Sequence, residues 1–438
     1  MKNHAGSTDE THVFTVVAIG ASAGGLEAFT HLLQALPNKT GMAFVLIQHL
    51  APTHHSLLSE LLGKKANMPV AEAKNGTIVE PNQVYVIPPN VNMGIQRSRL
   101  QLTPRLDEPG LHTPVDFFMR SLAEERHGRS IGVVLSGTGS DGTSGLATIK
   151  AEGGITFAQD EKSAKYSGMP HSAIASGCVD FVLPPEQIAR ELARISGHPY
   201  LSQNRTSSRV GEAKKPHAPD ENFERIFALV RKHCAINFSE YKPGTVHRRT
   251  LRRMAIHKIE HVNDYAKYLE KHPQEAENLC SDLLIPVTSF FRDLKAFEVL
   301  KTKVFPAITK DKNTKGTIRI WAPGCSTGEE TYSLAMVLLE FLDDKAPAFE
   351  IQIFGTDANE RGIEKARSGI YPERILQEVS PERLRRFFTE VEQGYRVNKF
   401  VRDLCVFAKQ NLAADPPFSR MNLVTCRNLS RRVMTRIG

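Results

Sequence analysis

The chain has 438 residues, which is enough for two or three domains with separate hydrophobic cores. Hydrophobic residues make up 41% and charged residues 24%, as in soluble globular proteins, and the net charge of +8 favours acidic partners without choosing among them. No apolar run approaches the roughly 20 residues that span a bilayer, and the start lacks a signal peptide's apolar core, so we expect a cytoplasmic protein without membrane insertion. The six cysteines are scattered, so we expect neither a disulfide framework nor a metal site.

The first predicted element is a buried strand at residues 13–19, followed by a Gly-rich turn that contains Ser22 and by a helix from about Gly25. A serine between small residues on such a turn has its hydroxyl lifted clear of the sheet, and backbone N–H groups at the helix start can hold an oxyanion. Such a turn also serves to cradle a phosphate or to allow close packing, so this motif alone leaves the three interpretations open.

Two further predicted strands end in polar residues. Residues 44–48 lead directly into His49, and residues 131–135 lead into a Gly-rich loop that contains Asp141. Ligands of an open α/β sheet bind beyond the carboxyl ends of its strands. We therefore predict that Ser22 attacks, that His49 takes and returns the proton, and that Asp141 orients the imidazole, although each partner alone is also explained by a strand-end histidine or a helix cap. His171 is a weaker alternative base.

Six motifs of this first part resemble the catalytic domain of the chemotaxis methylesterase CheB. They are residues 19–25, 48–50, 84–89, 112–116, 137–142 and 168–170. The resemblance implies a doubly wound parallel sheet and hydrolysis of glutamate γ-methyl esters on methyl-accepting chemotaxis receptors, and it leaves glutamine deamidation open. Ser22, His49 and Asp141 fall on that family's triad. The family usually has an N-terminal receiver domain, whereas only residues 1–12 precede the first strand, so control by phosphorylation within this chain is not expected.

A segment with little apolar periodicity, residues 197–222, is predicted to be a linker to a helical region. In that region four arginines form one stripe of a predicted helix, with Leu251 and Met254 facing inward. The four are Arg248, Arg249, Arg252 and Arg253. The stripe is either a solvated helix face or a docking surface for an acidic partner, and the lack of interleaved aromatic residues favours a protein over a nucleic acid.

The last part begins with a predicted strand from residue 317 that enters a Gly-rich turn and a helix, and the next strand ends in Asp357. Glycines let a nucleoside approach the backbone, and a following acid accepts hydrogen bonds from ribose hydroxyls. The spacing alone does not separate NAD from S-adenosylmethionine, although the absence of the Gly-x-Gly-x-x-Gly form lowers the case for NAD. A helix N-cap is an equally good interpretation of Asp357 in isolation.

Five motifs of this part resemble the chemotaxis methyltransferase CheR. They are residues 286–292, 324–330, 356–359, 366–371 and 426–428. The resemblance implies a small helical domain that contacts receptor helices, S-adenosylmethionine as methyl donor and receptor glutamates as acceptors. Its cofactor contacts fall on Thr288, Arg292, Glu329 or Glu330, Asp357, Asn411, Leu412, Arg427 and Asn428. Arg292 is expected to meet the cofactor's carboxylate or to orient the acceptor.

The family pattern continues well beyond its Cys-Arg-Asn motif, whereas this chain stops at Gly438. We therefore expect a truncated, incomplete Rossmann-like methyltransferase with impaired cofactor binding. The predicted domains are a methylesterase at 12–196, the linker, a helical domain at 223–285 and the cofactor domain at 286–438. The main hypothesis is a fused methylesterase and methyltransferase with no nucleic-acid partner. The alternatives are a non-catalytic scaffold that binds receptor-like helices and S-adenosylmethionine, and a nucleic-acid-associated methyltransferase.

Overall fold

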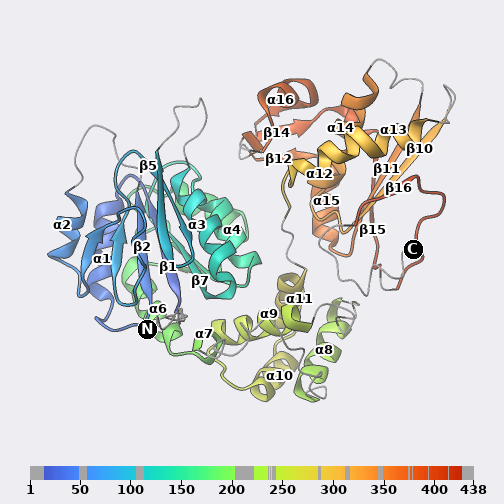
Figure 1. Ribbon diagram of the computed structural model, residues 1–438. Coiled ribbons are helices and arrows are strands. Elements are labelled where there is room, and N and C mark those ends of the chain that lie inside the picture. Colours follow the sequence, from blue (N-terminus) through green and yellow to red (C-terminus); the bar gives the residue numbers. More distant parts are fainter. Residues whose placement is uncertain are drawn as a thin grey trace, which may run out of the picture. The chain divides into compact units, whose positions relative to one another are not determined.

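The computed structural model (Figure 1) forms two compact units, each described here by itself. The described residues are 14–48, 57–104, 113–202, 221–234, 236, 238, 243–284, 288–310, 316–343, 349–372, 375–376, 378–392, 394–412 and 414–426. The first unit contains the described residues up to 202 together with 248–265, and the second contains 221–247 and the described residues from 266 onward. Two helices therefore cross the division between the units.

The first unit is built on a seven-stranded sheet of order β3-β4-β2-β1-β7-β8-β9. All neighbouring strands are parallel. The strands are β1 (Val16–Ala21), β2 (Ala43–Gln48), β3 (Val70–Glu72), β4 (Val84–Val86), β7 (Ser130–Val134), β8 (Ile155–Gln159) and β9 (Phe181–Leu183). The chain places β2, β3 and β4 on one side of β1 and then β7, β8 and β9 on the other, which confirms the predicted doubly wound parallel sheet.

Both faces of this sheet are covered, as the continuous apolar runs require. Along β1, Val17 and Ile19 join one core, while Val16 and Ala18 join the core on the opposite face. The first face is covered by α1 (Gly25–Ala35), α2 (Leu58–Gly63), α6 (Pro185–Ser196) and α7 (Pro199–Ser202). The second is covered by α3 (Pro114–Arg126), α4 (Thr143–Ala151), α5 (Gly168–Ala175) and the hairpin β5 (Val91–Gln96) to β6 (Arg99–Pro104), while the short turn η1 (His127–Arg129) follows α3.

Along the chain, the strands of the first unit are followed by four helices of the helical region. They are α8 (Glu221–Cys234), α9 (Pro243–Ile256), α10 (Val262–Lys271) and α11 (Pro273–Leu283). Within the second unit, α8 packs against α11. The C-terminal half of α9 belongs to the first unit.

The second unit contains a four-stranded parallel sheet of order β15-β11-β10-β16. Its strands are β10 (Thr317–Pro323), β11 (Glu350–Asp357), β15 (Cys405–Lys409) and β16 (Leu423–Val424). A small antiparallel sheet holds β12 (Ile370–Tyr371), β13 (Phe388–Val391) and β14 (Gly394–Val397). The helices are α12 (Leu294–Val299), the π-helical η4 (Leu300–Val304), α13 (Phe305–Thr309), α14 (Glu329–Leu342), α15 (Glu360–Ser368), α16 (Pro381–Phe387) and α17 (Lys399–Arg402).

A search of the described helices for a membrane-spanning segment gives no candidate of sufficient length and hydropathy.

Candidate active sites

Ser22 follows the last residue of β1 on a tight turn into α1. Its backbone N–H donates to the Ser136 carbonyl at 3.0 Å, and its own carbonyl accepts from the Gly25 N–H at 2.9 Å. Gly24 caps the helix with a φ of 76°, a left-handed conformation that glycine adopts without strain. The turn is therefore fixed at both ends by backbone hydrogen bonds, which hold the half-buried Ser22 at the carboxyl end of the sheet.

The strands that precede the three predicted triad residues are neighbours. Strand β1 lies between β2 and β7, with Ala21 opposite Gln48 and Gly20 opposite Val134. Asp141 lies in the loop that follows β7. His49 comes directly after Gln48 but lies outside the described residues, as do His54 and His55. The triad as a unit stays a prediction.

The carboxylate of Asp141 holds the start of α3. Its Oδ2 accepts the Val115 N–H at 3.0 Å, and its Oδ1 accepts the Asp116 N–H at 2.9 Å. Asp141 thus occupies the capping role that its sequence context also allowed, at a helix remote in sequence. Each carboxylate oxygen has a second lone pair, so these bonds leave acceptor capacity for an imidazole N–H.

A second buried carboxyl group, on Asp116, faces the Asp141 loop. One oxygen accepts the Gly145 N–H in the first turn of α4 at 2.6 Å. Burial, together with the negative charge of Asp141, raises the pKa of Asp116 to about 7. Asp141 therefore binds the start of α3, which carries Asp116, and Asp116 binds the start of α4, which follows Asp141. This role of Asp116 was not predicted from the sequence, although the residue closes one of the motifs of the first part.

Ser22 borders a hollow of about 530 Å³, whose lining includes Gln48, Glu27 and Lys165. The adjoining loop is fastened to the Ser22 turn by the Ser136 hydroxyl, which donates to the Ala23 carbonyl at 2.9 Å and accepts the Tyr166 N–H at 3.0 Å. The site therefore has room for a substrate side chain beside the hydroxyl.

Two other residues of this region have clear positions. Met169 is fully buried, and a Cβ added at Gly137 would lie 2.2 Å from its sulfur and 3.0 Å from the Ser22 nitrogen. Gly137 thus lets the Ser22 turn and Met169 approach each other. His171, the alternative base, has its Nδ1 2.9 Å from Glu161 Oε1 in an exposed pair.

In the second unit, Asp357 ends β11 and holds the Gly-rich turn that follows β10. Its Oδ2 accepts the Ser326 N–H at 2.9 Å, and its Oδ1 accepts the Asn359 N–H at 2.8 Å. Burial raises the pKa of Asp357. The turn itself needs left-handed backbone, with φ values of 72° at Gly324 and 94° at Gly328. The carboxylate and the turn are thus built as one structure.

Glu329, at the start of α14, is almost completely buried. Its Oε2 accepts the Thr327 hydroxyl at 2.6 Å, whereas its Oε1 has no hydrogen-bond partner among the described residues. The buried Ser326 hydroxyl likewise finds no partner in the described part of the chain. An unpartnered buried carboxylate oxygen is costly, so these atoms fit a bound group that donates hydrogen bonds. Glu330 is half-buried, which favours Glu329 as the ligand-facing member of the pair.

The remaining predicted cofactor contacts differ in how well the structure defines them. Asn411 follows β15, where Lys409 lies opposite Asp357, and its N–H donates to Asp415 at 2.7 Å. Leu412 and Thr288 are half-buried, and Arg292 is exposed. Phe291, next to Arg292, donates its N–H to Ser333 in α14. Arg427 and Asn428 lie outside the described residues.

Three family models match the chain in the order that the motifs predict. They are CheB methylesterase over residues 17–192, the CheR methyltransferase all-alpha domain over 221–284 and the CheR SAM-binding domain over 286–430. The chain joins a CheB methylesterase domain to a CheR methyltransferase. The predicted fusion is therefore confirmed, while the exact domain boundaries stay predictions.

Several known proteins are similar to this CheB–CheR chain. An uncharacterized 104.1 kDa protein of Rhodobacter capsulatus is 36% identical over 386 residues, which are 85% of this chain and 40% of that protein. Protein-glutamate methylesterase/protein-glutamine glutaminases of Desulfotalea psychrophila and Pectobacterium atrosepticum are 33% and 39% identical over 40% and 41% of this chain, and over 50% and 53% of their own lengths. The chain thus spans about half or less of these relatives.

A solved structure, the CheB methylesterase catalytic domain of Thermotoga maritima, is 31% identical with a TM-score of 0.39 and covers 42% of this chain and 98% of that domain.

Proposed function

We propose that the CheB unit, the part of the first unit that matches the CheB methylesterase model over residues 17–192, hydrolyses glutamate γ-methyl esters on chemoreceptor-type signalling proteins. The observation that carries this proposal is the position of Ser22, which stands half-buried on a glycine turn at the centre of a parallel sheet and borders a hollow. A serine hydroxyl needs a neighbouring base, and the strand that leads into His49 pairs directly with β1. Relatives that match this unit are named as methylesterases and glutaminases.

The reaction would proceed in two steps. Ser22 Oγ attacks the ester carbonyl while His49 takes its proton, and the C–O bond to methoxide breaks as His49 returns that proton, so methanol leaves. Water, deprotonated by His49, then attacks the acyl group, the bond to Ser22 Oγ breaks as His49 returns that proton to Oγ, and a free glutamate results. A glutamine side chain would follow the same course with ammonia as the leaving group.

We further propose that the CheR unit binds S-adenosylmethionine for methylation of carboxylates of the same class of protein. The impaired cofactor binding expected from the sequence stays a prediction. Glu329 and Asp357 would hold the cofactor, since the unpartnered Oε1 of Glu329 fits a protonated amine and a carboxylate at a strand end fits ribose hydroxyls. When bound, the cofactor supplies an electrophilic methyl group. The chain's own residues then need mainly to orient the acceptor carboxylate.

Methanol release from receptor protein carrying radiolabelled methyl esters tests the first proposal. The full chain should release methanol, and Ser22→Ala should lower the rate by at least about 10³-fold. Ser59→Ala, on α2, is the matched control and should behave like the unaltered protein. Release that persists in Ser22→Ala would contradict the proposal. No release from any of them, with the receptor still bound, would instead favour the non-catalytic scaffold.

A further inference from the structure

The arginine stripe of α9 is largely buried within the first unit. The sequence analysis expected a solvated face or a surface for an external acidic protein. In the structure Arg252 is 0% exposed, and Arg249 and Arg253 are below 10%. Burying three guanidinium groups is unfavourable unless each finds acceptors, so their partners show what the stripe is built to contact.

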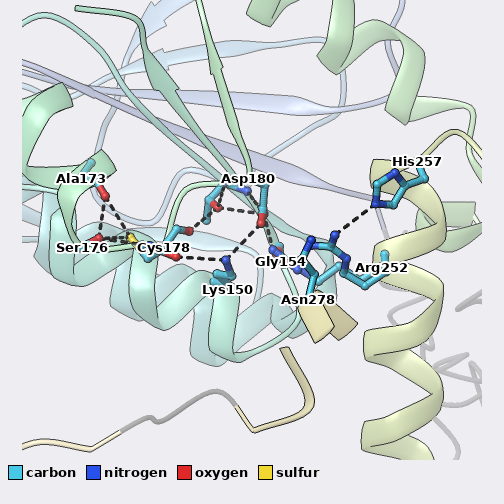
Figure 2. Close-up of polar contacts among 12 residues, drawn as sticks. Lys150, Gly154, Ala173, Ser176, Cys178, Asp180, Arg252, His257 and Asn278 are labelled. Atoms are coloured by element: carbon cyan, nitrogen blue, oxygen red, sulfur yellow. Dashed lines mark hydrogen bonds and ion pairs between the residues drawn. The ribbon is translucent and has the colours of Figure 1, made fainter. Parts of the chain in front are cut away.

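Arg253 Nη2 lies 3.1 Å from Nε2 of His257, just after α9, whereas the acceptors of Arg249 and Arg252 come from the CheB unit, as Figure 2 shows for Arg252. Its Nε donates to the Gly154 carbonyl at 2.7 Å, and its Nη2 forms an ion pair with Asp180 Oδ2. Arg249 donates to the Ala151 carbonyl at 3.0 Å. The fork of an arginine suits this combination of a carboxylate and a carbonyl, which a lysine could not satisfy in the same way.

Asp180 is held ready for this arginine by residues of its own domain. Its Oδ2 accepts the Thr156 N–H at 3.0 Å and the Thr156 hydroxyl at 2.9 Å, and Lys150 Nζ lies 3.4 Å from Oδ1. Burial alone would raise the pKa of this carboxyl, but the positive charges of Arg252 and Lys150 more than offset burial and hold the pKa below its usual range. The ionised Asp180 carboxylate is therefore held in a fixed position for its contact with Arg252.

Apolar packing and glycine geometry complete the contact. Ala255 is fully buried in the same core as Leu192 and Ile195, and its carbonyl accepts from Arg194 at 3.2 Å. A Cβ added at Gly153, which has a φ of 90°, would lie 2.9 Å from Arg248 Nε. The CheB unit thus leaves room for the arginines as well as offering them acceptors.

The contact lies at the amino ends of the sheet's strands, opposite the carboxyl ends where Ser22 lies. Gly153 and Gly154 precede β8, and Asp180 precedes β9, so both sites are at the amino ends of parallel strands. Ser22 follows the carboxyl end of β1. The α9 contact and Ser22 therefore lie at opposite ends of the parallel strands.

We propose that the arginine face of α9, formed by Arg248, Arg249 and Arg252, is an internal docking surface. Its partner is the amino-end edge of the CheB sheet in the same chain, that is, the loops that lead into β8 and β9. The pairing of Arg252 with Asp180 fixes the register of the helix on that edge. An external acidic protein reaches Arg249 and Arg252 only when α9 leaves this edge, so Asp180 and such a protein compete for the same arginines.

Hydrogen exchange of the full chain tests this proposal. In Arg252→Gln the backbone amides of α9 from residue 248 onward should exchange at least about tenfold faster, while β1 and β2 keep their protection. Arg190→Gln, at an exposed arginine on α6, is the matched control and should change neither region. Asp180→Asn should reproduce the change in α9, and the double variant should add little to either single variant.

Three results would overturn the proposal. One is unchanged α9 exchange in both Arg252→Gln and Asp180→Asn. Another is an equal rise in β1, which would show that Arg252 serves only the general stability of the unit. The third is that the unaltered chain binds poly-L-glutamate and that Arg252→Gln weakens this binding without any change in α9 exchange. The stripe would then face an external acidic partner.

Discussion

The two units use the same backbone device for different chemistry. Each places a Gly-rich turn between a central parallel strand and the helix that follows it, with a left-handed glycine before the helix, Gly24 in one and Gly328 in the other. In the CheB unit the turn carries a half-buried hydroxyl on Ser22 beside a hollow. In the CheR unit the buried carboxylate of Glu329 follows the turn, and the half-buried carboxylate of Asp357 binds it.

The acids show most clearly what the comparison teaches. Asp141 and Asp357 both follow central strands, and both bind backbone N–H groups through their two oxygens. Asp141 fixes a neighbouring helix, α3, whereas Asp357 fixes the glycine turn of its own site. Asp141 thus binds a helix beside the proposed nucleophile turn, whereas Asp357, from the neighbouring strand β11, binds the proposed cofactor turn directly.

Paired glycine substitutions should separate the two sites most strongly. In Gly137→Ala the new Cβ would lie 2.2 Å from the Met169 sulfur and 3.0 Å from the Ser22 nitrogen, so Met169 and the Ser22 turn must move apart and ester hydrolysis should fall about 100-fold. In Gly328→Ala the new Cβ would lie 2.8 Å from Ala366 Cβ at a φ of 94°, so binding of S-adenosylmethionine should weaken instead. Methanol release and titration calorimetry measure the two effects.

The matched control for this pair is Gly63→Ala on α2, where the nearest atom is 3.9 Å away. It should leave both readouts unchanged. If Gly137→Ala lowered hydrolysis and cofactor binding together, the two sites would not be the independent constructions compared above.

Glu329→Gln should sharpen the comparison on the CheR side. It replaces a buried carboxylate whose Oε1 has no partner among the described residues by a neutral amide, so the affinity for S-adenosylmethionine should fall about tenfold or more. Glu330→Gln, at the half-buried neighbour, should cause a clearly smaller loss. Calorimetry checks both, and an equal loss in the two variants would contradict the assignment of Glu329. Ester hydrolysis should not change in either.

Asp116→Asn should alter how the stability of the CheB unit depends on pH. The folded carboxyl has its pKa raised to about 7 from an ordinary value of 3.8, so its contribution to stability is present at acid pH and is lost as pH rises through about 7. The amide that replaces the carboxyl would stay neutral and keep an acceptor for the Gly145 N–H. The variant should therefore gain on the unaltered protein by about 1–2 kcal/mol between pH 5 and pH 8.

Urea unfolding at the two pH values measures this difference. The matched control is Glu124→Gln, an exposed acid on the same helix, which should follow the unaltered protein at both. If the gap between Asp116→Asn and the unaltered protein shrank toward high pH, the sign of the Asp116 contribution would be wrong.

The sequence predicts strand ends well because apolar runs and glycines mark them locally. The positions of Ser22 and Asp357 at strand ends follow from such signals, whereas the doubly wound order of the strands is implied by the family resemblance. Helical spacing likewise shows that Arg248, Arg249 and Arg252 share a face, but it carries no information on what covers that face. The covering acid, Asp180, is 72 residues away from Arg252. The pairing of Asp116 with the Asp141 loop escaped prediction for the same reason.

The smallest expected effect concerns the choice of base in the CheB site. The His171 side chain is 67% exposed and its partner Glu161 is 49% exposed, and such surface pairs contribute only about 0–1 kcal/mol. His171→Asn should therefore leave methanol release within about twofold of the unaltered rate. His49→Asn, the matched substitution after the strand that pairs with β1, should lower it by at least about 10³-fold. Equal losses in the two variants would show that hydrolysis needs both histidines, and a loss confined to His171→Asn would move the proton transfer to His171 and remove His49 from the mechanism. Either result would leave Ser22 as the nucleophile, because its position on the turn depends on neither histidine.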